Sequence, residues 1–211
     1  MRRDLLVNDE FYHIYNRGAD KREVFLTRHD YSRFLSSIVE FNTELPGWQI
    51  RNLKNSGIKV RPRLEEQLVD VVAYCLNPNH FHLLLRQRKD AGITEFMRKV
   101  ITGYTMYFNK KNERSGVLFQ GKFKSVHIDS NEQLLYVSAY VNCNSEVHGI
   151  GKAKNYLWCS FNEYCGRESG INCQKEVILE QLHDSHDYGP YALNHAVEIK
   201  VKKEMGKLVI E

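Results

Sequence analysis

Residues 71–85 read VVAYCLNPNHFHLLL, two apolar runs joined by an Asn-Pro-Asn turn. Short runs of β-branched and apolar residues that are bounded by a turn signal predict buried strands. Side chains alternate across a strand, so His80 and His82 should point to one face and Phe81 to the other. Two imidazoles on one face can share a metal ion or a phosphate. The alternative interpretation is a hydrogen-bonded pair of histidines at the end of a strand.

Length and composition limit the class of protein. The chain has 211 residues, enough for one domain with a substantial core. It contains no apolar run long enough to cross a membrane, and its first residues lack the apolar core of a signal peptide. Its five cysteines include no CxxC pair, which favours a reduced, cytoplasmic protein over a disulfide scaffold. The spacing of these cysteines and the nearby histidines fits no common zinc pattern.

The net charge of +4 is unevenly distributed along the chain. Between Arg86 and Lys124, ten Lys or Arg residues stand against three Asp or Glu residues. A basic segment beside a candidate metal site favours a polyanionic partner. A solvated charged surface is the alternative that charge alone leaves open.

Hydrophobic periodicity predicts the element order β-α-β-β-α-β followed by further helices. The strands are predicted at residues 11–16, 71–76, 80–85 and 117–128. The helices are predicted at 30–41, 91–112 and 131–144, with a short helix at 161–165 and one or two beyond 175. This order matches the ferredoxin-like split β-α-β arrangement. We therefore predict an α+β fold with a central antiparallel sheet, helices on one face and a C-terminal helical extension.

Two local features complete the prediction. Residues 46–66 contain two prolines and two glycines, which predicts a long loop or insertion with a short strand near residues 48–50. Ser130 is a predicted N-cap of the helix that follows, with Gln133 at the capping-box position.

That helix carries Tyr136, Tyr140 and Asn144, which are four residues apart and therefore share one helical face. A tyrosine placed there can present its phenolate to a phosphate held on the sheet. Tyrosine is a weak nucleophile at neutral pH because its pKa is about 10, and a divalent cation assists by polarising the phosphoryl oxygens. The alternative is ordinary packing, which is common for any one of twelve tyrosines.

Four segments of the chain resemble motifs of the single-tyrosine (HUH) transposases and of their REP-associated branch. They are residues 77–85 (NPNHFHLLL), 116–125 (GVLFQGKFKS), 139–149 (AYVNCNSEVHG) and 156–164 (YLWCSFNEY). The first resembles the His-hydrophobe-His motif of these transposases. The others resemble the branch patterns G-x-L-F-Q-G-R-[FY]-K-S, R-Y-I-H-x-N-P-V-x-A-G and Y-x-W-S-S-[FY]-x-x-Y. The resemblance covers roughly residues 8–166, in the same order and spacing.

The resemblance implies a single-tyrosine transposase-like domain over residues 1–166 and an extension of unassigned role over residues 167–211. It implies that His80, His82 and Asn144 bind Mg²⁺ or Mn²⁺ and that Tyr140 is the catalytic nucleophile. It also implies DNA contacts from Arg17, Gln120, Lys122 and Lys124.

The activity implied by the resemblance is cleavage and rejoining of single-stranded DNA beside a hairpin. This reaction leaves a 5′-phosphotyrosine and a free 3′-OH, and a monomer or a homodimer carries it out. On this basis we expect a metal-dependent DNA transposase with hairpin DNA as its partner.

Departures from the motifs leave further hypotheses open. Ser145 stands where the branch has proline, and Ala139 stands where it has arginine, but neither change removes a reacting group. Tyr136 makes the segment similar also to two-tyrosine replication initiators, so Tyr136 is a candidate second nucleophile, although we expect it to be a packing residue. The chain is also compatible with a non-catalytic, domesticated hairpin-binding protein, with a metallohydrolase that uses water, and with an RNA-binding module that needs no metal.

Overall fold

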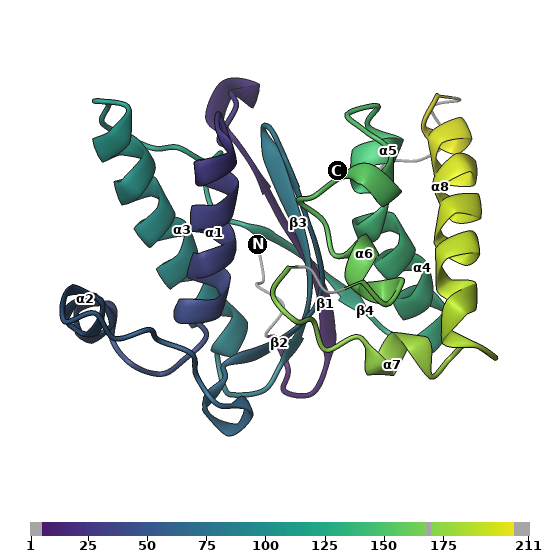
Figure 1. Cartoon of the computed structure of the whole chain (residues 1–211), viewed down its shortest axis with the longest axis horizontal. Coiled ribbons are helices and arrows are strands. Elements are labelled where there is room, and N and C mark those ends of the chain that lie inside the picture. Colours follow the sequence, from purple (N-terminus) through teal and green to yellow (C-terminus); the bar gives the residue numbers. More distant parts are fainter. Residues whose placement is uncertain (1–5, 168–169, 205–211) are drawn as a thin grey trace.

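The computed structural model describes residues 6–167 and 170–204 and places a four-stranded sheet between two layers of helices (Figure 1). The strands are β1 (Phe11–Arg17), β2 (Val69–Asn77), β3 (His80–Gln87) and β4 (Lys124–Ile128). Their order is β2-β3-β1-β4 and each pairing is antiparallel. This is the order of a ferredoxin-like sheet, so the predicted fold is confirmed.

The β2–β3 hairpin forms because residues 69–77 are apolar enough to be buried throughout, and the Pro78-Asn79 turn reverses the chain. Asn77 and His80 pair in register beside the turn. Phe81 packs against Phe34 and Phe119 on one face of the sheet, with ring centroids 5.2 and 5.6 Å away. The histidines that flank Phe81 belong to the opposite face, as strand alternation predicts.

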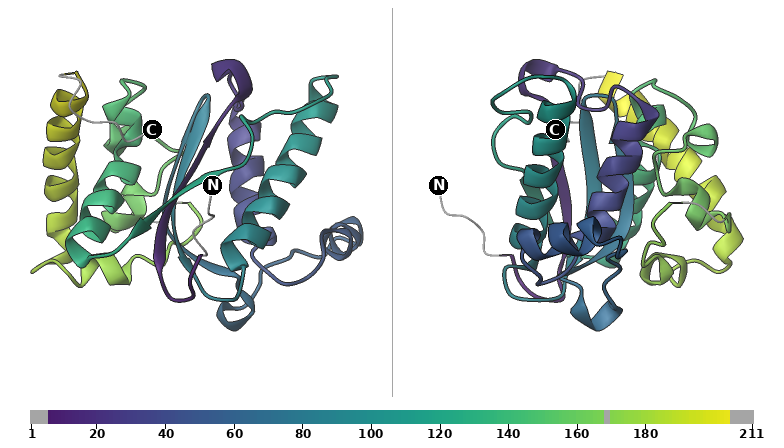
Figure 2. Two further views of the ribbon diagram at one scale, coloured as in Figure 1. Left: turned by 180° about the vertical axis from the view of Figure 1, so that it is seen from behind. Right: turned by 60° about the vertical axis from the view of Figure 1, so that its left-hand side comes forward.

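Helices α1 (Arg28–Glu40) and α3 (Gly92–Lys111) cover the Phe81 face (Figures 1 and 2). Gly103 lets α3 approach the end of α1, because a Cβ atom there would lie 2.7 Å from the Phe41 ring. Asp30 ties the two helices together: it accepts hydrogen bonds from the Thr27 backbone N (2.8 Å), Lys111 Nζ (2.7 Å) and Tyr107 Oη (2.8 Å). Burial raises the pKa of Asp30, but these hydrogen bonds outweigh burial and hold that pKa below its usual value.

The other face is covered by α4 (Asn131–Asn142), α6 (Phe161–Tyr164) and α8 (Tyr188–Glu204). Two short helices, α5 (Asn144–Val147) and α7 (Glu176–Leu179), lie beside them. The expectation of helices on one face only is therefore wrong. The apolar residues of β2 and β3 point to both faces, and a second hydrophobic core forms between this face and the C-terminal helices. The terminal residues 205–211 of the predicted extension lie outside the described residues.

Two predicted elements differ in the structure. The segment near residues 48–50 belongs to a helix, α2 (Gly47–Asn55), which follows Pro46 and buries Ile50. The last strand begins at Lys124, not at residue 117, because Leu118 and Phe119 turn inward to the core and Gly121 adopts a left-handed φ of 68°. Single 3-10 turns occur at Ala19–Lys21, Leu64–Glu66, Ala153–Asn155 and Ser185–Asp187.

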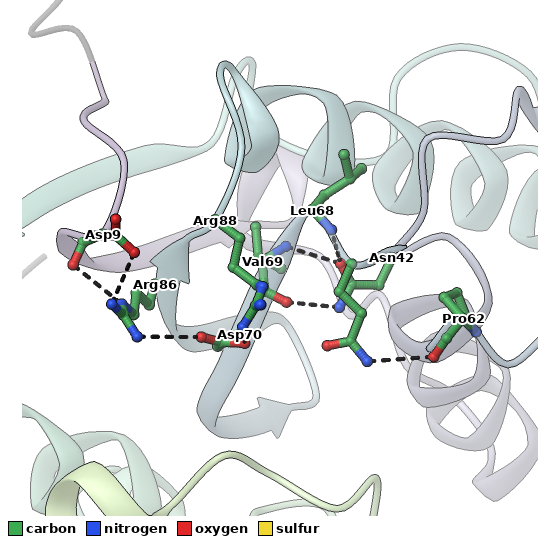
Figure 3. A network of polar contacts seen from close by, with 9 residues as sticks. Asp9, Asn42, Pro62, Leu68, Val69, Asp70, Arg86 and Arg88 are labelled. Carbon is green, nitrogen blue, oxygen red and sulfur yellow. Dashed lines mark hydrogen bonds and ion pairs between the residues drawn. The ribbon is translucent and has the colours of Figure 1, made fainter. Parts of the chain in front are cut away.

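A polar network fixes the end of the sheet opposite the β2–β3 turn (Figure 3). Asp70 on β2 accepts a hydrogen bond from Arg88 Nη1 at 2.9 Å, and Arg86 pairs with Asp9 at 2.8 Å. Asn42 caps the start of β2 by accepting from the Leu68 backbone N (2.9 Å) and donating to the Val69 carbonyl (2.8 Å). Across the described residues, no helix has the length and apolar character needed to cross a membrane.

Candidate functional site

His80 and His82 occupy the first and third positions of β3 and are both buried. Their ring centroids are 5.1 Å apart and the rings are nearly perpendicular, at 89°. The predicted pair therefore lies on one face of the sheet, directly after the β2–β3 turn.

Hydrogen bonds orient both imidazoles. His80 Nδ1 lies 2.6 Å from Asn79 Oδ1, which can only accept, so Nδ1 carries the proton and Nε2 keeps its lone pair. His82 Nδ1 shares a hydrogen bond of 2.8 Å with His13 Nε2 of β1. Outer hydrogen bonds of this kind fix the ring orientation and the tautomer of histidines that bind metals.

The third predicted ligand lies beside His80. Asn144 Oδ1 is 3.2 Å from His80 Nε2, and Asn77 Nδ2 donates to both atoms, at 2.5 and 2.9 Å. His80 Nε2 and Asn144 Oδ1 thus both direct a lone pair toward Asn77 Nδ2. Two lone pairs that converge in this way can also bind a cation. Imidazole nitrogen and amide oxygen are suitable ligands for Mn²⁺, and the oxygen suits Mg²⁺. In the described part of the chain, no group of three His, Cys, Asp or Glu residues is arranged to hold a metal ion. The candidate third ligand, Asn144, is an amide.

Helix α4 brings Tyr140 to the same place. The helix begins at the predicted N-cap, where Ser130 Oγ accepts from the Gln133 backbone N at 3.1 Å. The Tyr140 ring stands edge-on to the rings of His82 and His13, with centroids 5.5 and 5.7 Å away. The candidate nucleophile and the candidate metal ligands are therefore neighbours within one chain.

The end of α4 differs from a continuous helix. Residues up to Asn142 are helical, Cys143 is the C-cap, and Asn144 begins α5. Asn144 nevertheless reaches His80, because the short second helix restarts directly at this residue. Ser145, at the position of the motif proline, is buried within α5.

Tyr136, one turn before Tyr140, contacts a different part of the molecule. Its ring lies 5.7 Å from the ring of His195 on α8. Burial raises the pKa of Tyr136, and the negative charge of Glu198 raises it further. The structure thus places the candidate second nucleophile against the C-terminal helix.

The predicted DNA-binding residues lie along one edge of the site. Arg17 ends β1 opposite His80, and its Nε atom is buried without a hydrogen-bond partner among the described residues. The Gln120 backbone N donates to the Arg17 carbonyl at 2.7 Å, while the Gln120 and Lys122 side chains are exposed. Lys124 Nζ lies 5.6 Å from the centre of the Tyr15 ring.

Sequence reasoning missed several residues that complete the site. His13 and Tyr15 both stack on His82, and the His148 ring lies 4.8 Å from the His80 ring. The sequence did contain a signal for His13 and Tyr15: they are two residues apart in the first predicted strand, so their side chains share a face. His148 stands where the motif of the branch has alanine, so the resemblance gave no reason to select it.

Residues 58–144 match the family model of IS200-like transposases. Over this region the chain is similar to IS200-like transposases. It contains His80, His82, Tyr140 and Asn144, and the predicted resemblance is confirmed. The family match supports a transposase-type function for the protein.

A solved structure of a REP-associated tyrosine transposase bound to a REP hairpin is similar, with a TM-score of 0.55 and 15% sequence identity. The match covers 79% of this chain and 86% of that chain. At 15% sequence identity, this structural similarity shows that the two proteins share a fold. No sequence among the curated proteins matches this chain.

Proposed function

We propose that this protein is an IS200-like transposase, a metal-dependent endonuclease and strand transferase that acts on single-stranded DNA beside a hairpin. The observation that carries the proposal is the position of Tyr140, whose ring lies 5.5 Å from that of His82. The family match supports a DNA-processing activity, and the similar solved structure holds a REP hairpin.

Three side chains would hold Mg²⁺ or Mn²⁺: His80 through Nε2, His82 and Asn144 through Oδ1. When bound, the cation neutralises charge on the scissile phosphate and polarises its oxygens. Asn79 and His13 keep the two imidazoles in position through their hydrogen bonds to the opposite ring nitrogens.

Tyr140 performs the bond exchange. Its Oη attacks the phosphorus, a P–Oη bond forms, the bond from phosphorus to the 3′ oxygen breaks, and the phenolic proton passes to that oxygen through solvent. The products are a 5′-phosphotyrosine and a free 3′-OH. Attack by another 3′-OH on the same phosphorus reverses the sequence and joins a new strand. The covalent intermediate keeps the energy of the phosphodiester bond available for this second transfer.

Three cations, Arg17, Lys122 and Lys124, together with the amide of Gln120, bind the DNA backbone near the hairpin. Lys124 lies beside Tyr15, so a phosphate and an adjacent unpaired base are both accommodated there. The closeness of Tyr140 to the histidines and Asn144 within one chain supports a reaction in which Tyr140 acts in its own subunit.

A covalent-trapping assay tests the proposal. The protein is incubated with Mn²⁺ and labelled single-stranded hairpins from the repeats that flank its gene, and the products are separated on a denaturing gel. We expect labelled protein that disappears with Tyr140→Phe or a chelator and persists with Tyr136→Phe. Loss of label with either tyrosine would support a two-tyrosine nickase. Cleavage that survives Tyr140→Phe would indicate a water nucleophile, and tight binding without any adduct would leave a hairpin-binding protein.

A further inference from the structure

A second surface lies on the face of the sheet that is turned away from Tyr140. It is a groove lined by residues of α1, α2 and α3, with a volume of about 440 Å³, and we call it the α2 groove. The three helices lie on the same side of the sheet (Figure 2). Six cations from these three helices line it: Arg33, Arg51, Lys54, Arg98, Lys99 and Lys110. Three of the six belong to the basic segment that the sequence singles out, and the catalytic site does not use them.

The α2 groove carries an excess of positive charge. No Asp or Glu is among its lining residues. Glu40 and Glu95 lie beside the groove, and each pairs with two of the six cations at distances of 2.6–3.3 Å. Arg51 and Lys110 are exposed and have no ion-pair partner among the described residues. Two carboxylates against six cations leave a surface that attracts anions.

The floor of the groove is apolar. It is formed by Phe41, Ile50, Gly103, Met106 and Tyr107. Met106 is 56% exposed, and Trp48, next to the lining residue Gly47 on α2, is 64% exposed. An exposed apolar surface that is rimmed by charged residues commonly marks a binding site. The occupant must therefore combine negative charge with an apolar or aromatic face.

We propose that the α2 groove binds a second stretch of single-stranded DNA. Its phosphates contact the exposed cations of the rim, Arg51 and Lys110 first, and its unpaired bases lie against the apolar floor. A duplex would place its stacked bases out of reach of Met106 and Tyr107. An acidic amphipathic helix would satisfy the same charges. DNA is favoured because strand transfer brings two DNA segments to one protein, and this choice rests on the proposed function.

The test measures binding alone, so it does not depend on cleavage. The affinity of the full-length protein for a labelled 20-nucleotide thymidine strand is followed by fluorescence anisotropy over a series of NaCl concentrations. The variants are Arg51→Glu and Lys110→Glu. The control is Lys200→Glu, an exposed lysine on α8 that undergoes the same change of charge on the opposite side of the sheet.

We expect each groove variant to reduce the slope of log K against log [NaCl] by about 0.7, the value for one phosphate contact to a single strand. We also expect a several-fold weaker affinity at low salt, while Lys200→Glu behaves as the wild type. A strand carrying 4-thiothymidine should crosslink to the helix that contains Met106 and Tyr107. Circular dichroism shows whether each variant is folded.

Unchanged slopes in both folded groove variants would overturn the proposal. So would binding of a Glu-rich helical peptide that is lost in Arg51→Glu while DNA binding stays intact, because this result would assign the groove to a protein partner. The catalytic proposal can fail separately. In that case the wild type forms no adduct with hairpins, but the groove variants still bind the thymidine strand more weakly than the wild type does.

Discussion

Asn79 determines which nitrogen of His80 is available to a cation. Its Oδ1 accepts from His80 Nδ1 at 2.6 Å, and its own Nδ2 donates to the Lys21 carbonyl at 3.3 Å, which fixes the orientation of the amide. The lone pair of His80 is therefore confined to Nε2, on the side of Asn144. A residue that only looks like part of a turn in the sequence thus controls the geometry of the candidate metal site.

Replacing Asn79 with alanine should weaken metal binding. Without its acceptor the imidazole can rotate or change tautomer, and loss of such an outer partner typically lowers metal affinity about 10–100-fold. Isothermal titration with Mn²⁺ measures the effect directly. Asn112→Ala, an asparagine at the end of α3, is the control and should bind Mn²⁺ as the wild type does. Equal affinity of Asn79→Ala and the wild type would show that His80 does not depend on this hydrogen bond.

The sequence predicted the individual site residues better than their partners. Alternation along one strand was enough to put His80 and His82 on one face. The His13–His82 hydrogen bond was not predictable, because it depends on the register between β1 and β3, which are far apart in the chain. The role of His148 was also hidden, since its closeness to His80 arises from the turn that follows α5.

At the level of elements, the position of Tyr140 depends on the contacts between α4 and α8. Tyr188 on α8 is fully buried, and its hydroxyl is hydrogen-bonded to Ser138 (3.1 Å) and Asn142 (2.6 Å). These two residues flank Tyr140 in the sequence of α4. Asn142 in turn accepts from Ser160 at the start of α6. The C-terminal helix therefore locks the helix that carries the candidate nucleophile.

We predict that Tyr188→Phe slows adduct formation more than it weakens substrate binding. The change leaves buried Asn142 without its hydroxyl partner, which costs about 1–3 kcal/mol, and loosens α4. The control is Tyr164→Phe, which removes a buried hydrogen bond of 2.8 Å to Val72 on β2. Single-turnover rates are compared with DNA affinities for variants of similar stability. A rate loss that is the same in both variants would contradict a specific role of α8.

Asp30 should make the joint between α1 and α3 sensitive to acid. Its pKa is below the usual value, so its stabilising effect is complete above about pH 4, the ordinary pKa of aspartate, and is lost as the pH falls through its folded-state pKa. We predict that Asp30→Asn destabilises the protein by about 1–3 kcal/mol at pH 7 and by less near pH 2. Urea unfolding at both pH values measures this, with exposed Asp20→Asn as control. If the loss in the free energy of unfolding caused by Asp30→Asn were the same at both pH values, the lowered pKa of Asp30 would be contradicted.

Elements with strong periodicity were predicted well, and those shaped by distant contacts were not. The helices that contain Phe34 and Phe96 follow from their apolar spacing. The α2 helix was missed because Pro46 and Gly47 suggested a loop, while Ile50 is its one buried residue. The late start of β4 depends on burial of Leu118 and Phe119 against other elements, and local sequence does not encode that burial.

For the whole molecule, the sheet separates two surfaces with different chemistry. The face under α4 gathers the histidines, Tyr140 and Asn144, and the face under α1 and α3 supports the cationic α2 groove. The fold class could be predicted because the element order alone defines it. On the second face, α4 and α6 were predicted, but the position of α8 was not, because the tail beyond residue 175 has a weak pattern and gains its order by packing on α4.

The measurement that tests the central claim most directly is mass spectrometry of the covalent product. The protein is incubated with Mn²⁺ and a hairpin oligonucleotide, then digested with nuclease and trypsin. The tryptic peptide 125–152 contains both Tyr136 and Tyr140, and fragmentation distinguishes them. We predict a nucleotide phosphate on Tyr140, next to the histidine pair. A nucleotide on Tyr136, or cleaved DNA without any modified tyrosine, would contradict the proposed mechanism.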